Sequence, residues 1–161
     1  MKIRKATIED LPKMREIFNY GRELQIQTGN PNQWEEGYPS KDLMRADMEK
    51  GAAHVCESDQ GEIMAVLSVF TEPDPTYYEI EGQWLNDEPY TTIHRIATSG
   101  VVKGVGQYCL QWVQERSENV RIDTHKDNAP MKYVLEKLGF AYCGVIYLDN
   151  GDPRDAYHYT K

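Results

Sequence analysis

The sequence predicts an α/β protein in which a mixed β-sheet carries helices on both faces. Strand-like and helix-like runs alternate in the order strand, helix, helix, three strands, helix, strand, helix, two strands, which is typical of layered α/β folds. The run Ile63–Phe70 is almost entirely apolar, as expected for a strand that is covered on both faces. A length of 161 residues without an internal repeat suits one domain, so residues 1–161 are expected to form a single domain.

Seven runs have the length and composition of strands, and four have the periodicity of helices. The strands are expected at Lys2–Ala6, Ala53–Ser58, Ile63–Phe70, Thr91–Thr98, Val120–Thr124, Tyr142–Leu148 and Asp155–Thr160. The helices are expected from Thr7 to about Leu24 and at Lys41–Lys50, Val105–Arg116 and Asn128–Leu138. Tyr77–Glu81 is a further candidate for a short strand.

Local signals mark where these elements begin and end. Thr7 followed by Asp10 three residues later resembles a capping box at the start of the first helix. Ser40 can cap the second helix, and Gly51 closes it. Residues 59–62, Asp-Gln-Gly-Glu, form the turn of a hairpin between the second and third strands.

Composition narrows the class of partner. The formal net charge of −8 disfavours a nucleic-acid binder and is compatible with a cationic or amine substrate. No signal peptide or apolar run of about 20 residues is present, so we expect a cytoplasmic protein without a membrane partner. Three widely spaced cysteines are expected to be buried thiols in a reducing compartment.

A glycine-bearing turn, Ser99–Gln107, separates the strand at 91–98 from the following helix. A turn of this kind leaves backbone N–H groups free at the positive end of the helix dipole, which suits a phosphate or pyrophosphate. Gly104 and Gly106 let an anion approach the main chain, and Lys103 adds a positive charge. The alternative is an ordinary tight turn. The turn lacks both the Gly-x-Gly-x-x-Gly pattern and the Gly-Lys-Ser/Thr ending of nucleotide-binding loops.

Two motifs resemble those of the GNAT superfamily of acyl-CoA-dependent N-acyltransferases. The family's phosphate loop, Gln/Arg-x-x-Gly-x-Gly/Ala, is similar to Val101–Gly106, and its Asn-x-x-Ala…Gly-Phe helix is similar to Asn128–Phe140. The order of elements agrees as well, so the resemblance covers Ile3–Tyr159. It implies a mixed, mostly antiparallel sheet of six to seven strands with helices on both faces.

The sequence departs from the family's pattern at three positions. Val101 stands in place of the usual Gln or Arg, and Met131 stands in place of a small residue. Leu135 occupies the position at which many members carry the tyrosine that returns a proton to the CoA thiolate. The resemblance therefore supports cofactor binding more strongly than it supports a standard mechanism.

The resemblance implies that acetyl-CoA is the cosubstrate and that no metal is needed. Its pantetheine arm would lie along the strand edge His94–Thr98, between two parallel strands that splay apart, and its pyrophosphate would rest on Lys103–Gln107. The implied cofactor-binding residues are Ile96, Ala97, Thr98, Val102, Lys103, Gly104, Val105, Gly106, Gln107 and Asn128. The scattered histidines do not have the spacing of a zinc site.

A direct attack by the amine requires a base. His94 lies on the implied catalytic strand and titrates in a suitable range, although it could also be a packed or hydrogen-bonded strand residue. Glu81, like Glu79, precedes that strand and could act through water or be merely solvated. His125 ends the next strand and could equally cap the helix that follows.

The acid that protonates the leaving thiolate is less well defined. Tyr147 could approach from the sixth strand, whereas Tyr133 is rotated about 200° from the position of Leu135 on the same helix. Water could also supply the proton, because a thiolate is a good leaving group and does not need a dedicated acid. The candidate catalytic residues are therefore His94, Glu81 and Tyr147.

Two long loops, 28–40 and 72–89, would flank the acceptor pocket. Their aromatic residues Trp34, Tyr38 and Trp84 could hold a cationic amine or could anchor the loops to the core. The function expected is transfer of an acetyl group from acetyl-CoA to a small-molecule or peptide amine, and a homodimer is plausible for the fold. The alternative is a non-catalytic acyl-CoA-binding sensor or interaction domain.

Overall fold

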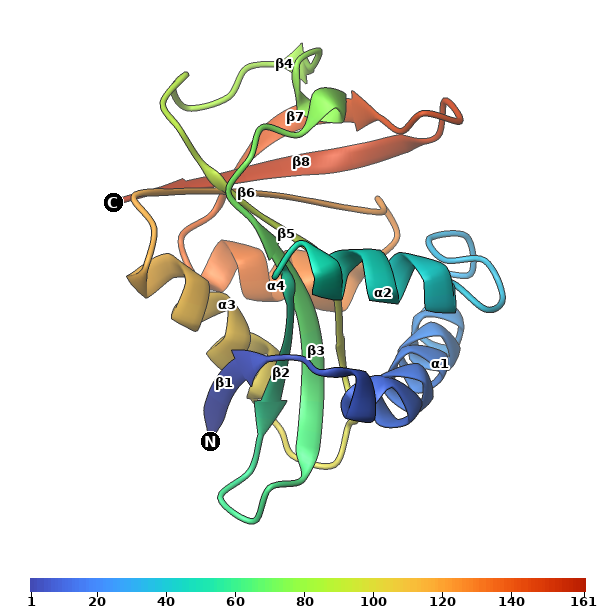
Figure 1. Ribbon diagram of the computed structural model, residues 1–161. Coiled ribbons are helices and arrows are strands. Elements are labelled where there is room, and N and C mark those ends of the chain that lie inside the picture. Colours follow the sequence, from blue (N-terminus) through green and yellow to red (C-terminus); the bar gives the residue numbers. More distant parts are fainter.

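The computed structural model describes residues 1–161 and contains one eight-stranded sheet with the strand order β1-β2-β3-β5-β6-β8-β7-β4 (Figure 1). The strands are β1 (Lys2–Lys5), β2 (Ala53–Glu57), β3 (Ile63–Phe70), β4 (Glu81–Gly82), β5 (Thr91–Thr98), β6 (Asn119–Thr124), β7 (Ala141–Tyr147) and β8 (Pro153–Thr160). The α-helices are α1 (Leu11–Gln27), α2 (Lys41–Glu49), α3 (Val105–Glu115) and α4 (Ala129–Lys137). None of these helices is both long and apolar enough to span a membrane.

The predicted α/β class and the mostly antiparallel sheet are confirmed, but the predicted count of six to seven strands is wrong. All strand pairs are antiparallel except β5 and β6. The additional strand is β4, which has only two residues and pairs with β7 at Val145 and Gly144. Gly82 and Gly144 lie so close that a Cβ on either would overlap the other's backbone. Tyr77, the first residue of the short strand expected at Tyr77–Glu81, belongs instead to a 3₁₀ turn at residues 75–77.

Separate apolar clusters cover the two faces of the sheet. On one face, α3 and α4 pack their buried residues, including Leu110 and Leu135, against β3, β5 and β6. On the other face, α1 and α2 pack against β2 and β3 through residues such as Met14 and Met44. A third cluster, centred on Tyr77, joins the loop after β3 to β7 and β8. The predicted helices on both faces are therefore confirmed.

The only parallel pair, β5 and β6, separates soon after it forms. The pairing register contains Thr91 with Val120 and Thr92 with Arg121 and extends no further. From His94 onward the β5 backbone leaves β6, and the two strands diverge toward the loop that begins α3 (Figure 1). This divergence opens the centre of the sheet.

A bulge in β5 lies at the point of divergence. The pairing between β3 and β5 shifts by one residue between Val66–Ala97 and Ser68–His94, which leaves an extra residue on β5. Arg95 lies in this bulge with a positive φ of 53°, a conformation that is unusual for a residue with a side chain. Its guanidinium forms two bonds of 2.8 and 2.9 Å to Asp47 of α2, and Ser68 donates to the same carboxylate at 2.7 Å. These contacts hold the bulge in place.

Candidate active site

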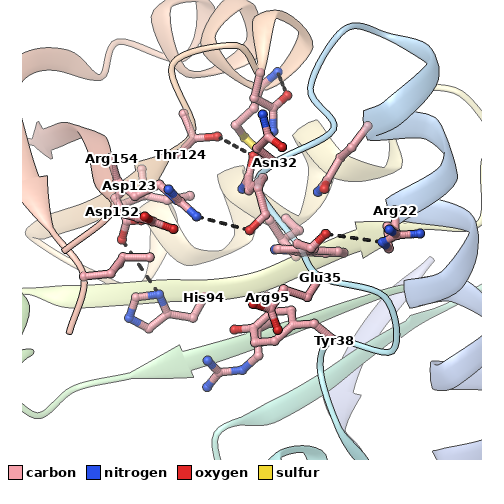
Figure 2. Close-up of a pocket in the computed structure, with 18 of the residues that line it drawn as sticks. Arg22, Asn32, Glu35, Tyr38, His94, Arg95, Asp123, Thr124, Asp152 and Arg154 are labelled. Carbon is pink, nitrogen blue, oxygen red and sulfur yellow. Dashed lines mark hydrogen bonds and ion pairs between the residues drawn. The ribbon is translucent and has the colours of Figure 1, made fainter. Parts of the chain in front are cut away.

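A cavity of about 870 Å³ lies at the divergence of β5 and β6, between α1 and the start of α4. Its walls come from α1, the loop at 28–40, β5, the end of β6 and the start of β8. Figure 2 shows Asp123, Asp152 and Arg154 on one side of this space and Arg22 on the other, while the side chain of Arg95 points away from it. The charged residues that line it are Arg22, Glu35, Asp74, Arg95, Asp123, Asp152 and Arg154, together with His94.

His94 lies between two carboxylates in this cavity. Its Nε2 atom is 2.6 Å from Asp74 Oδ2, and its Nδ1 atom is 4.0 Å from Asp123 Oδ2. Asp123 also accepts a 2.6 Å hydrogen bond from Tyr77, a fully buried phenol whose pKa is raised by burial and by the charge of Asp123. Tyr77 therefore stays protonated at neutral pH and fixes the position of the Asp123 carboxylate.

The ionisation of Asp74 determines which nitrogen of His94 carries a proton. Desolvation acts to raise the pKa of Asp74, but hydrogen bonds from His94 and Thr76 outweigh it and lower the pKa to about 2. An ionised carboxylate can only accept, so Nε2 of His94 must be the donor. In the neutral imidazole the lone pair is then on Nδ1, the atom that faces Asp123.

The depressed pKa of Asp74 predicts a pH-dependent contribution to stability. A carboxylate with a pKa of about 2 in the folded state and 3.8 in the unfolded state stabilises the protein above the unfolded value. The contribution of about 2 kcal/mol is lost as pH falls from about 4 toward 2. We expect Asp74→Asn to lower the free energy of unfolding near pH 7 and to match the wild type more closely near pH 3, as measured by urea denaturation. A difference that stays constant with pH would contradict this assignment.

The loop at 28–40 is fastened across the cavity by one glutamine. The side-chain oxygen of Gln33 accepts bonds from Asn30 at 2.8 Å, Asn128 at 2.9 Å and Thr124 at 3.5 Å. Arg154 donates to the backbone oxygen of the same residue at 3.1 Å. Gln33 thus ties the loop to the end of β6, to the start of β8 and to the start of α4.

A second cavity of about 470 Å³ lies beside the first, where β5 approaches α3 and α4. Seven of the predicted cofactor-binding residues line it: Ile96, Ala97, Thr98, Gly104, Gly106, Gln107 and Asn128. Val105 is buried beneath the turn, whereas Val102 and Lys103 are exposed on it. The two spaces adjoin, because this groove shares five lining residues with the larger cavity: Gln25, Trp34, Ile96, Asn128 and Met131.

The glycine turn has the open backbone that an anion needs. Gly104 has a φ of 82°, and a Cβ built on it would have no atom within 4 Å. Gly106 lies in the first turn of α3, and its nearest neighbour would be Thr98 Cγ2 at 3.6 Å. The residues present therefore fit a pyrophosphate at the α3 N-terminus.

The other predicted catalytic residues lie apart from His94. Tyr147 donates a 3.0 Å hydrogen bond to Glu81, and both are exposed and line neither cavity. Glu79 and Tyr133 are exposed as well. The structure brings only His94 of the three candidates into the larger cavity.

Two further positions have structural roles. His125 Nδ1 accepts a 3.1 Å bond from the N–H of Asp127, so this histidine caps the turn before α4. Leu135 is fully buried in the core between α4 and the sheet, which leaves no polar group at that position. Trp34 lines both cavities, while Trp84 lines neither and packs on Tyr77.

Sequence reasoning missed several residues of the larger cavity. Asp74 lies in a Pro-Asp-Pro segment of the long loop, whose length indicated a function but not a partner. Asp123 lies 29 residues after His94 in the sequence, yet the two side chains are close in the folded chain. Gln33 and Arg154 carry no sequence signal, because their contacts join segments 121 residues apart. No group of three or more His, Cys, Asp or Glu side chains is arranged to hold a metal ion.

The chain is similar to solved structures of GNAT acetyltransferases. A GNAT-family acetyltransferase from Streptococcus agalactiae 2603 is 34% identical, with 99% of this chain and 95% of that chain covered and a TM-score of 0.89. A GNAT-family acetyltransferase from Listeria monocytogenes 4b F2365 is 16% identical, with coverage of 99% and 94% and a TM-score of 0.74. No family model and no curated protein sequence matches the chain.

A further solved structure contains the cosubstrate. The phosphinothricin acetyltransferase from Sinorhizobium meliloti, solved in complex with AcCoA, is 15% identical to this chain. It aligns with 99% of this chain and 87% of its own, with a TM-score of 0.63. At this identity the similarity concerns the fold.

Proposed function

The chain belongs to the GNAT family of acetyltransferases, and we propose that it transfers an acetyl group from acetyl-CoA to a primary amine. The observation that carries this proposal is that the two cavities are adjacent. The groove at the glycine turn and the cavity that holds His94 share lining residues, among them Ile96. A thioester placed in the groove would therefore meet an amine placed beside His94.

The cofactor groove supports acetyl-CoA through its own residues. The N–H groups at the start of α3 would bind the pyrophosphate, with Lys103 at the mouth of the groove. The edge of β5 from Ile96 to Thr98 would line the pantetheine arm. When bound, acetyl-CoA supplies the acetyl group and a thiolate leaving group.

Asp123 and His94 are proposed to bind the acceptor amine. Asp123 Oδ2 and His94 Nδ1 are 4.0 Å apart, so both can lie within hydrogen-bond distance of one nitrogen atom. Asp123 would hold the ammonium, and Nδ1 would take one of its protons. Asp74 keeps the other ring nitrogen protonated and stabilises the imidazolium that results.

The remaining step is the transfer itself. The amine nitrogen would form a bond to the acetyl carbon as the carbon–sulfur bond breaks. The acylated nitrogen would then release its second proton to water, and the thiolate would take a proton from water. Backbone N–H groups at the β5 bulge, near His94 to Ile96, would polarise the carbonyl as negative charge develops. Leu135 cannot act as the acid, which is why solvent is assigned this role.

A test of the cofactor site uses thermal unfolding with acetyl-CoA and with an adenine nucleotide that lacks the pantetheine arm. Acetyl-CoA at about 100 times its Kd should add roughly 2.7 kcal/mol of stability, which is a shift of a few degrees in Tm. Gly106→Val should reduce this shift by about half or more, because its side chain would stand where the pyrophosphate meets the α3 N-terminus. We expect a loss of affinity of about tenfold or more.

Gly106→Ala is the matched control. Its Cβ would make an ordinary 3.6 Å contact with Thr98 Cγ2, so the fold and most of the affinity should be retained. Equal shifts for wild type and Gly106→Val would mean that acetyl-CoA does not bind at this turn. Buried Leu135 also favours a second candidate function, acyl-CoA binding without turnover, which predicts the same shift but no amine-dependent release of thiol.

A further inference from the structure

Arg154 is the least compensated charge in the larger cavity. Its side chain is only 6% exposed, yet no carboxylate oxygen lies within 4.0 Å of it. Two of its five N–H groups donate to backbone oxygens, of Pro153 at 2.8 Å and of Gln33 at 3.1 Å. Its Nε atom has no partner on the chain and is not sealed from solvent. A nearly buried cation of this kind is stabilised by an anion.

Neither of the two other largely buried arginines of the sheet is both unpaired and at the cavity. Arg95 is paired with Asp47 by two bonds. Arg121 lies over the rings of Trp84 and Tyr90, at 4.3 and 4.1 Å from their centres, and does not line the cavity. Arg121 has a buried Nε without a hydrogen-bond partner, but it does not reach the cavity, so Arg154 is the one of these three arginines that lines the cavity without a carboxylate partner. Its uncompensated charge also acts on a neighbour, because burial and Arg154 together lower the pKa of His125.

The anion partner of Arg154 would lie close to the proposed amine site. Asp123 pairs with Ala156 across β6 and β8, and Arg154 is two residues from Ala156 on the same face of β8. Two residues along a strand correspond to about 7 Å. Figure 2 shows Asp123 and Arg154 on one side of the cavity and Arg22 on the other. An acceptor that contacts both Asp123 and Arg154 must carry its anionic and cationic groups only a few bonds apart.

We propose that the acceptor is a free α-amino acid, with its ammonium group at Asp123 and His94 and its carboxylate at Arg154. The α-amino acid is the biological amine in which an oxyanion and an ammonium share one carbon atom, and Arg binds a carboxylate through two parallel N–H groups. This inference rests on the proposed function and adds the substrate class. A peptide N-terminus has a neutral amide at the corresponding place and would leave Arg154 without an anion.

The test compares acceptors that differ only in the carboxylate. Thiol release from acetyl-CoA is measured with several L-amino acids, with their primary amides and with the corresponding decarboxylated amines. We expect the acids to have the highest kcat/KM, by about tenfold or more over the amides and amines, as for a lost charge-assisted hydrogen bond. Arg154→Gln should raise KM for the acids by a similar factor and change kcat/KM for the amides by less than about threefold.

Two further variants keep the test decisive. Arg154→Lys retains the charge and should recover part of the preference for acids, even where Arg154→Gln unfolds because Gln33 loses a donor. Arg45→Gln, on the exposed side of α2 and outside the cavity, should behave as the wild type. Equal or better turnover of the amides or amines would overturn the α-amino acid assignment and leave acetyl transfer intact. No thiol release with any member of the panel would overturn the proposed function, and the assignment with it.

Discussion

Replacing His94 by alanine is expected to lower kcat/KM for amine acetylation by about 10²- to 10⁴-fold, the usual contribution of a general base. His94 is the one candidate base that lines the acceptor cavity, and Asp74 holds its Nε2 atom at 2.6 Å. The affinity for acetyl-CoA should change little, because His94 does not line the cofactor groove. The measurement is steady-state thiol release, together with the thermal shift caused by acetyl-CoA.

Rescue separates a chemical role of His94 from a structural one. Added imidazole should restore part of the activity of His94→Ala, since it can enter the space that the side chain vacates. Glu81→Gln and Tyr147→Phe test the other two sequence candidates, and we expect at most about a twofold loss because neither residue lines a cavity. A large loss in Tyr147→Phe with a small loss in His94→Ala would reverse the assignment.

Replacing Asp47 by alanine is expected to lower the free energy of unfolding by about 3–5 kcal/mol, the usual effect of removing one partner of a buried ion pair. Asp47 is buried in α2, where it accepts two bonds from Arg95 and one from Ser68. Its removal leaves a mostly buried guanidinium without an anion and frees the strained bulge of β5. Urea denaturation measures the change.

Asp42 offers a control on the same helix. Its carboxylate is exposed and lies 3.9 Å from Arg45, so Asp42→Ala should change stability by less than about 1 kcal/mol. Because the bulge backbone is proposed to polarise the thioester carbonyl, Asp47→Ala should also lower kcat under conditions in which the protein remains folded. Similar unfolding energies for the two variants would show that the pair with Arg95 does not hold the bulge.

The elements that the sequence predicted well are those with local signals. The apolar run of β3, the cap at Ser40 and the glycine turn before α3 each depend on residues that are close in the chain. Periodicity and capping are properties of such short segments, so they predicted the four α-helices and the two-sided sheet. The two-residue strand β4 has no such pattern, since its pairing depends on the close approach of Gly82 and Gly144.

The acceptor site could be predicted only in part for the same reason. His94 was found because its strand precedes the glycine turn, but its partner Asp74 lies in an irregular loop 20 residues earlier. Arg154 and Gln33 meet only after the sheet has formed. The residues that define the charge of the cavity therefore come from six segments, and only the folded chain brings them together.

Acetylation of a primary amine with His94 as the base is tested most directly by the release of CoA thiol from acetyl-CoA as a function of amine concentration, with mass spectrometry of the acceptor. We expect release that depends on the amine, an N-acetylated product in equal amount, and loss of both in His94→Ala. Binding of acetyl-CoA without amine-dependent release for any acceptor would contradict it, and would identify the protein as a non-catalytic binder of acyl-CoA.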